Sequence, residues 1–305
     1  MGNKRQSGTY ISMLVGVNLI WAGSFPAMAI AVSAMSPLLI TVVRLGTGAL
    51  VLFPFLKREG FKNWNLRTVL LCFILGAVGF TAPITLETSG LAASTPAMAA
   101  IAIAMEPLFT AIAASIMLHE RLTSRRIFAF LLALLGAWII AGMPRPGAPG
   151  YFWGDILLLL AVICYAIYNT YSSLLTTFLS PTASAGATLL AGFLTSIPVW
   201  VIAGSPTPSD MDRAQTSALL YLCLGATAAA YLLWQVILDR FQVSFAALFL
   251  YLQPIFGVVL SVLIIGTHPP TYFYAGSVII LFAIFIGQKT QKIRVPSNVK
   301  EGAQI

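Results

Sequence analysis

The chain has 305 residues, of which 59% are hydrophobic and 9% are charged, with a mean hydropathy of +0.91. Soluble domains carry about 25% charged residues, so the composition excludes a soluble protein and predicts an all-α integral membrane protein. The net charge of +8 does not indicate nucleic-acid binding, because the basic residues flank apolar segments throughout the chain. We therefore expect the lipid bilayer as a partner and no nucleic acid.

Ten apolar segments are about long enough to cross a bilayer, which takes roughly 20 residues. The fourth is the longest of the ten, and Pro107 within it predicts a kink or a tilt. The first is too long for the apolar part of a signal peptide, so we expect it to be retained. The segments cover residues 10–31, 36–56, 67–86, 91–118, 124–142, 152–173, 181–203, 214–237, 243–266 and 271–288.

Lysine and arginine residues predict the orientation, because they favour the cytoplasmic side of a membrane. With the N-terminus inside, fourteen of them fall in cytoplasmic segments, and only Arg145 and Arg213 fall outside. Arg44 is the one basic residue well inside a predicted span rather than at its end. The pattern predicts ten transmembrane helices with both termini in the cytoplasm.

The two halves of the chain resemble each other at an offset of 147 residues. Ala99, Ala100, Pro107 and Phe109 recur as Ala246, Ala247, Pro254 and Phe256. Two halves of five spans insert in opposite directions, which gives an inverted five-plus-five repeat. We expect a first repeat over 1–142, an external Pro/Gly linker over 143–150, a second repeat over 151–288 and a basic cytoplasmic tail over 289–305.

Arg44 and Glu106 are the only ionisable residues well inside the predicted spans. Such residues usually face the bundle interior and find a partner. Arg44, Pro107 and Pro254 are interpreted as structural intramembrane residues. Glu106 either pairs structurally or takes part in substrate binding or proton coupling. Its counterpart Gln253 cannot titrate, so coupling would be carried by one half only.

Aromatic residues with polar edges lie deep in several spans, among them Trp21, Tyr165, Tyr168 and Tyr251. Tyr165 and Tyr168 are three residues apart and share a helix face. These side chains either line a cavity at the middle of the membrane or pack between helices. Other aromatic residues lie near span ends, where an interfacial position is expected: Trp64, Tyr151, Trp153, Trp200, Tyr272 and Tyr274.

The remaining polar motifs predict no chemistry. His119 and Glu120 close the fourth span without a second histidine at metal-ligand spacing, so a solvated span end is expected, with Thr123 or Ser124 capping the next helix. The three cysteines imply neither a disulfide nor a metal site. No nucleotide-binding loop is present, and we expect no cofactor, no metal and no enzymatic activity.

Several local motifs resemble the drug/metabolite transporter superfamily, in its EamA-domain branch. They are Trp-Ala-Gly-Ser-Phe at 21–25, Arg44, Glu-Pro-Leu at 106–108, Glu-Arg-Leu-Thr at 120–123 and Gln-Pro at 253–254. The second copy departs at 267–270, where the glutamate is lost. The resemblance implies helices around a central cavity and a multi-pass protein of the inner (plasma) membrane, acting as a monomer or weak dimer.

The resemblance also implies secondary transport of a small molecule, with export of amino acids or related metabolites as the two halves rock. Trp21, Tyr165 and Tyr168 are similar to cavity aromatics of exporters of the YddG type, whereas Ala104 and Glu106 depart from that group and favour a broader amino-acid range. The alternative function is a nucleobase or nucleoside carrier. A membrane-embedded enzyme or a scaffold is a more distant alternative. The residues expected at the substrate are Trp21, Phe80, Glu106, Tyr165, Tyr168, Tyr251 and Gln253.

The topology can be tested by cysteine labelling. In a variant without the native cysteines, Arg145→Cys should react with an impermeant maleimide added outside the cell, and Lys62→Cys should react only after the membrane is opened. Positive-inside insertion is the physical reason. Labelling with the opposite sidedness would contradict the predicted orientation.

Overall fold

A computed structural model describes residues 2–59, 64–144, 151–204, 210–266 and 268–288. In these ranges the chain forms helices joined by short turns, and no strand occurs, so the expected all-helical class is confirmed. The residues named for the labelling test, the linker from 145 onward and the predicted tail lie outside the described residues.

Within the described part, eight helices are long and apolar enough to cross a membrane. They comprise Gly8–Ala31, Pro37–Arg58, Leu66–Ala92, Met98–Met117, Phe152–Leu175, Pro181–Ile202, Arg213–Arg240 and Val243–Ile264. The helices α6 (Ser124–Ile140) and α13 (Thr271–Gly287) have 17 residues each, at the lower end of the usual range for a span. The count of ten spans and the orientation of the termini therefore stay predictions.

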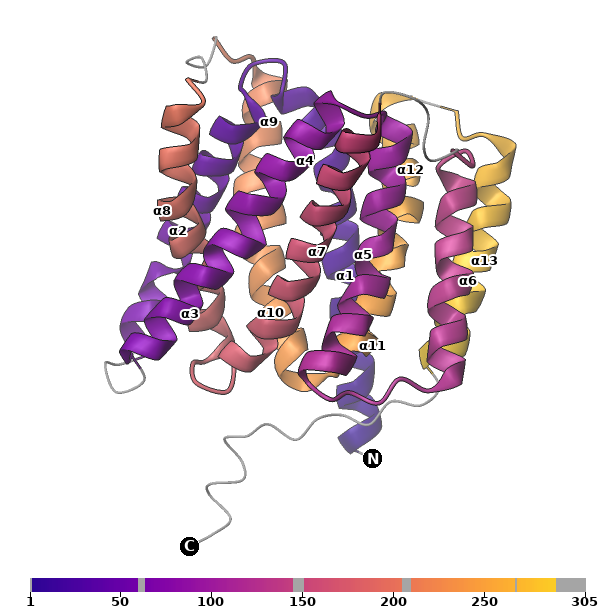
Figure 1. Ribbon diagram of the computed structural model, residues 1–305, viewed down its shortest axis with the longest axis horizontal. Helices are drawn as coiled ribbons and strands as arrows, with labels where there is room; N and C mark the ends of the chain where they lie inside the picture. The colour runs from indigo at the N-terminus through magenta and orange to yellow at the C-terminus, as the bar shows by residue number, and fades with distance from the viewer. Residues whose placement is uncertain (1, 60–63, 145–150, 205–209, 267, 289–305) are drawn as a thin grey trace, which may run out of the picture. The chain divides into compact units, whose positions relative to one another are not determined.

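The helices form two compact units, and each unit takes helices from both halves of the chain (Figure 1). The first unit holds Met1–Thr81 and Tyr171–Gln242, and the second holds Ala82–Thr170 and Val243–Gln291. The two units defined by contacts therefore do not coincide with the two predicted sequence repeats. The repeats stay a prediction.

The first unit is built on close helix packing around α8 (Pro181–Ile202). Helices α2 (Pro37–Arg58) and α3 (Leu66–Gly76) both lie against α8. A side chain at Gly76 would meet the amide nitrogen of Gly192 at 2.5 Å, so only glycine allows this approach of α3 and α8. Small residues give such contacts in a membrane, where the hydrophobic effect does not drive helices together.

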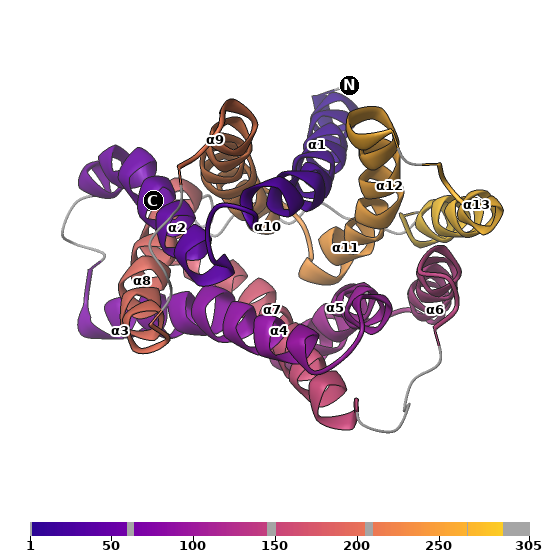
Figure 2. The same cartoon turned by 90° about the horizontal axis from the view of Figure 1, so that it is seen from above.

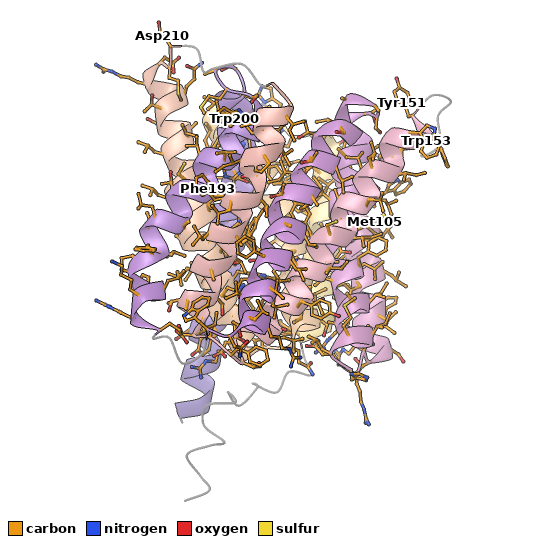
Figure 3. All side chains as sticks on the ribbon, turned by 60° about the vertical axis from the view of Figure 1, so that its left-hand side comes forward. Met105, Tyr151, Trp153, Phe193, Trp200 and Asp210 are labelled. Atoms are coloured by element: carbon orange, nitrogen blue, oxygen red, sulfur yellow. The ribbon has the colours of Figure 1, made fainter. Side chains whose placement is uncertain are left out.

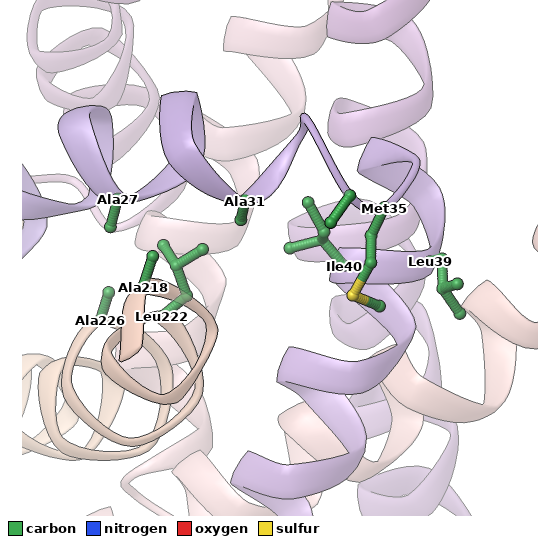
Figure 4. Close-up of a cluster of buried hydrophobic side chains, with 9 residues drawn as sticks. Ala27, Ala31, Met35, Leu39, Ile40, Ala218, Leu222 and Ala226 are labelled. Carbon is green, nitrogen blue, oxygen red and sulfur yellow. The ribbon is translucent and has the colours of Figure 1, made fainter. Parts of the chain in front are cut away.

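The rest of the first unit is α1 (Gly2–Ala31), α9 (Arg213–Leu220), the π-helical turn η3 (Tyr221–Ala229) and α10 (Ala230–Arg240). Ala27 and Ala31 of α1 face Ala218 and Leu222 in a buried apolar cluster (Figure 4). The small side chains of α1 again permit close contact between the two helices.

The second unit contains α4 (Ala82–Ala92), α5 (Pro96–Met117), α6, α7 (Phe152–Leu175), α12 (Leu252–Ile265) and α13. The last residues of α7 belong to the first unit. Helices α6 and α13 lie side by side (Figure 2). A side chain at Gly136 would meet the carbonyl oxygen of Gly276 at 2.8 Å, so glycine on both helices is needed for this contact.

The fourth predicted span is not the longest one. Thr95 caps the N-terminus of α5 and Pro96 is its first residue, so the helix begins later than expected and has 22 residues. The preceding helix continues to Ala92 and has 27 residues, and Arg213–Arg240 has 28. The expectation was wrong because the start signal of α5, Thr95 followed by Pro96, was not used to end the preceding helix.

Both of these long helices contain a π-helical segment, η2 (Ala77–Thr81) in one and η3 in the other. At the 147-residue offset, 77–81 corresponds to 224–228, which lies within η3. Such turns leave backbone carbonyls without their regular helical partner and often occur at functional sites. The matched positions make these turns a shared feature of the two halves.

The two intramembrane prolines have different surroundings. Helix α5 continues through Pro107, whereas the chain around Pro254 is divided into α11 (Val243–Leu248), the 3-10 turn η4 (Phe249–Tyr251) and α12. Pro254 is the third residue of α12, where a helix makes no use of the amide hydrogen. The second copy therefore breaks before its proline, and the first copy does not break.

From the sequence, Glu120 was expected in a solvated helix end, and this expectation is wrong. The side chain of Glu120 is only 9% exposed. Its carboxylate accepts hydrogen bonds from the amide nitrogens of Val243 (2.8 Å) and Ser244 (3.0 Å) and from the Ser244 hydroxyl (2.6 Å). It thus caps α11 from a distant loop. Thr123 caps α6, as predicted.

The first unit contains a similar contact. The Glu59 carboxylate accepts hydrogen bonds from the amide nitrogen of Ser180, at 3.0 Å, and from the Ser180 hydroxyl. Ser180 is the N-cap of α8. In each unit, a glutamate that follows one helix therefore fixes the start of another, where a negative charge is favourable.

The capping role of Glu120 predicts that Glu120→Ala lowers the free energy of unfolding by about 3 kcal/mol, because three hydrogen bonds to a buried carboxylate are lost. Thermal unfolding in detergent measures this change. Arg121→Ala, at an exposed residue of the same loop, is the matched control and should have little effect. Equal stability of the two variants would contradict a structural role for this cap.

Candidate functional site

The second unit contains a cluster of polar side chains among its apolar helices. We call this cluster the acidic site. It consists of Glu87 on α4, Glu106 and Thr110 on α5, and Tyr165 and Asn169 on α7. Glu106 is half-buried, and its neighbour Met105 lies midway along α5 (Figure 3). Charged side chains at such positions usually mark substrate or ion pathways.

Asn169 connects α7 to two residues of α5. Its side-chain nitrogen donates a hydrogen bond to Glu106 Oε1 at 2.9 Å and lies 3.4 Å from Thr110 Oγ1. Glu106 and Thr110 are four residues apart and therefore share one face of α5. Asn169 is 6% exposed and Thr110 is fully buried, so this network lies in the interior of the unit.

Glu87 was missed by the sequence reasoning, which ended the third span at residue 86 and so left Glu106 and Arg44 as the only ionisable residues in spans. In the structure Glu87 lies within α4, and the Tyr165 hydroxyl donates to Glu87 Oε2 at 3.4 Å. The sequence does hold a signal for it. Thr95 followed by Pro96 is a typical helix start, and the preceding helix can extend to that point.

The acidic site holds two carboxyl groups, and its helices carry no basic residue. Glu87 and Glu106 lie close enough to influence each other electrostatically. Helices α4, α5 and α7 contain no lysine or arginine, and the donors to the two carboxylates, Tyr165 and Asn169, are neutral. A ligand with a positively charged group would gain energy there by compensating this charge.

The first unit contains an aromatic cluster of Trp21, Phe80, Tyr231 and Trp234. The Trp21 ring lies 5.4 Å from the rings of both Tyr231 and Trp234, and Phe80 lies 4.9 Å from Tyr231, all in edge contacts. Such pairs are favourable beyond the area they bury. The structure thus brings the two predicted residues Trp21 and Phe80 together around Tyr231.

The turn η3 provides polar partners for Trp21 and Arg44. The indole nitrogen of Trp21 donates to the Ala226 carbonyl at 3.1 Å, and Arg44 Nε donates to Thr227 Oγ1 at 3.0 Å. Thr227 in turn donates to the Leu222 carbonyl at 2.8 Å. Two side chains from α1 and α2 therefore bind consecutive residues of the π-helical turn.

The remaining predicted residues lie in the second unit as follows. Tyr168 and Tyr251 are buried, at 2% and 1% exposed, and the Tyr251 ring is 6.3 Å from that of Phe130. Gln253 is half-buried near the start of α12. Glu106 and Tyr165 thus have polar partners in Asn169 and Glu87, whereas Tyr168 and Tyr251 pack in the interior.

The ends of the apolar helices carry the expected aromatic residues. Tyr151 and Trp153 lie together at the start of α7 (Figure 3), with exposures of 41% and 73%. Amphipathic rings at this position favour the boundary between lipid and water. Among the described residues, no group of three or more histidine, cysteine or acidic side chains is arranged to hold a metal ion.

Comparison with known families and proteins gives consistent results. The sequence model of the EamA-like transporter family matches residues 8–142 and again residues 152–286. The protein named "Uncharacterized transporter YyaM" from Bacillus subtilis (strain 168) is 23% identical over 300 residues, which cover 96% of this chain and 97% of the relative.

A biotin transporter from Escherichia coli (strain K12) is 25% identical over 285 residues, covering 92% of this chain and 93% of the relative. A solved crystal structure of a protein that is 18% identical matches the fold with a TM-score of 0.79, covering 92% of this chain and 96% of the other. That likeness concerns the fold alone.

Proposed function

Because the chain belongs to the EamA-like transporter family, we propose that it is a secondary transporter that exports amino acids by alternating access across the inner membrane. The observation that carries this proposal is the acidic site. Two intramembrane carboxylates, each hydrogen-bonded to a neutral donor, provide a place for the ammonium group that every free amino acid has.

The proposed interaction is a charge-assisted hydrogen bond from the substrate ammonium to Glu106, with Glu87 adding to the negative potential. Asn169 donates to one oxygen of Glu106, and a carboxylate has about four lone-pair positions, so it can accept further donors. Hydrogen bonds between charged partners are roughly twice as strong as neutral ones. Tyr165 contributes a polarised hydroxyl and an apolar ring on the same helix face.

A second candidate is a carboxylate-bearing compound such as biotin, which is named for one of the relatives. Arg44 favours this candidate, because a guanidinium matches the geometry of a carboxylate. Arg44 and Trp21 bind the same π-helical turn, and the Trp21 ring could contact an apolar part of the substrate. Biotin has no ammonium group, however, and so gains nothing from Glu106.

Counterflow in proteoliposomes distinguishes these candidates. Vesicles containing the purified protein are preloaded in turn with threonine, methionine, phenylalanine, biotin or a nucleoside, and uptake of the labelled compound is followed. Exchange of the amino acids supports the proposal. Exchange of biotin alone favours the second candidate, and exchange of the nucleoside alone favours a nucleoside carrier. No exchange of any amino acid contradicts the proposed function.

The role of Glu106 is tested by Glu106→Gln, which keeps the shape and removes the charge. We expect roughly tenfold weaker exchange of amino acids, because a charged hydrogen bond of about 1.5 kcal/mol or more is lost. Met105→Leu, at the adjacent residue, is the matched control. Unchanged exchange and an unchanged pH profile in Glu106→Gln would show that Glu106 contributes neither to binding nor to coupling.

A further inference from the structure

We infer that Asn169 is a positioning residue that orients the Glu106 carboxylate for the substrate's amino group, with Tyr165 acting in the same way on Glu87. The inference rests on the proposed function, in which the acidic site binds the amino group of the substrate. It adds that two side chains of α7 make the site selective for amines. Neither residue was expected to act through a glutamate.

The geometry of α7 supports this assignment. Tyr165 and Asn169 are four residues apart, so they share one helix face. From this face Tyr165 donates to Glu87 on α4, and Asn169 donates to Glu106 on α5. One face of one helix therefore supplies one neutral donor to each of the two intramembrane carboxylates.

Asn169 is the better-fixed donor of the two. Its hydrogen bond to Glu106 is 2.9 Å long, compared with 3.4 Å for that from Tyr165 to Glu87. The same amide nitrogen also lies 3.4 Å from the hydroxyl of Thr110. An amide nitrogen has two hydrogens, which match two acceptors one turn apart on α5. Both ends of the contact are thus constrained by the helices.

The chemical type of the donor matters for selectivity. A lysine or arginine at position 169 would hold Glu106 equally well but would cancel its charge. Asparagine fixes the orientation of the carboxylate and leaves the charge available to a cationic group. Preorganised carboxylates bind a ligand without first losing side-chain entropy. Removing the amide donor should therefore weaken the binding of amines more than that of uncharged or acidic analogues.

The test compares ligand pairs that differ only in the amino group: L-phenylalanine with 3-phenylpropionate, and L-methionine with 4-(methylthio)butanoate. The dissociation constants are measured on the purified full-length protein, and their ratio gives the preference for the amine. Asn169→Leu, which keeps a similar size without the donor or a charge, and Asn169→Ala should each lower this preference roughly tenfold. Tyr165→Phe should lower it less, because its hydrogen bond is longer.

Thr170→Val is the matched control, since the buried hydroxyl of Thr170 donates to the Ala166 carbonyl of its own helix. The preference should stay unchanged in this variant. Thr110→Val removes one acceptor of the Asn169 amide and should give a smaller decrease. This variant decides the question if the Asn169 variants do not yield monodisperse protein.

The outcomes separate the inference from the proposed function. If Glu106→Gln lowers the preference for the amine and the Asn169 or Thr110 variants do not, the positioning role is overturned. If Glu106→Gln has no effect on the preference, or the unmodified protein does not prefer either amine, the proposed function fails and the inference fails with it. A merely structural role of Asn169 would weaken both members of each ligand pair equally.

Discussion

The cost of leaving a polar atom without a partner inside a hydrocarbon layer governs the interior of this protein. Several polar side chains within the apolar helices meet this cost in one of two ways, whereas the buried hydroxyls of Ser184 and Tyr251 and the indole nitrogen of Trp200 have no hydrogen-bond partner among the described residues. Trp21 and Arg44 bind groups of the π-helical turn η3. Glu106 binds a side chain of α7. The first kind of contact provides partners for groups of a π-helical turn. The second kind holds a carboxyl group inside the second unit.

The four glutamates in these contacts show how the partner determines the role. Glu59 and Glu120 accept hydrogen bonds from backbone amides at the starts of other helices, where the helix dipole also favours a negative charge. Their charges are therefore used within the fold. Glu87 and Glu106 receive only neutral side-chain donors in the contacts shown here. Ionisable side chains inside a membrane protein usually serve function, and the proposed role of Glu87 and Glu106 rests on this difference from Glu59 and Glu120.

Sequence reasoning predicted the helical class, the family and most apolar segments, because strong apolarity over 20 residues is a local signal. It failed where the deciding partner is distant in the sequence. The partner of Glu120 is 123 residues away, and that of Glu106 is 63 residues away. Glu87 was missed because a helix boundary was placed too early, and nothing in the sequence indicated the turns η2 and η3.

The two halves of the predicted repeat differ in the chemistry of corresponding side chains. At the 147-residue offset, Glu87 corresponds to Trp234 and Glu106 corresponds to Gln253. Trp234 belongs to the aromatic cluster of the first unit, in edge contact with Trp21. The two carboxyl groups of the first half thus correspond to one aromatic ring and one neutral amide in the second half. The predicted repeat therefore does not extend to the side chains at these positions, because an acidic group in one half has no acidic counterpart in the other.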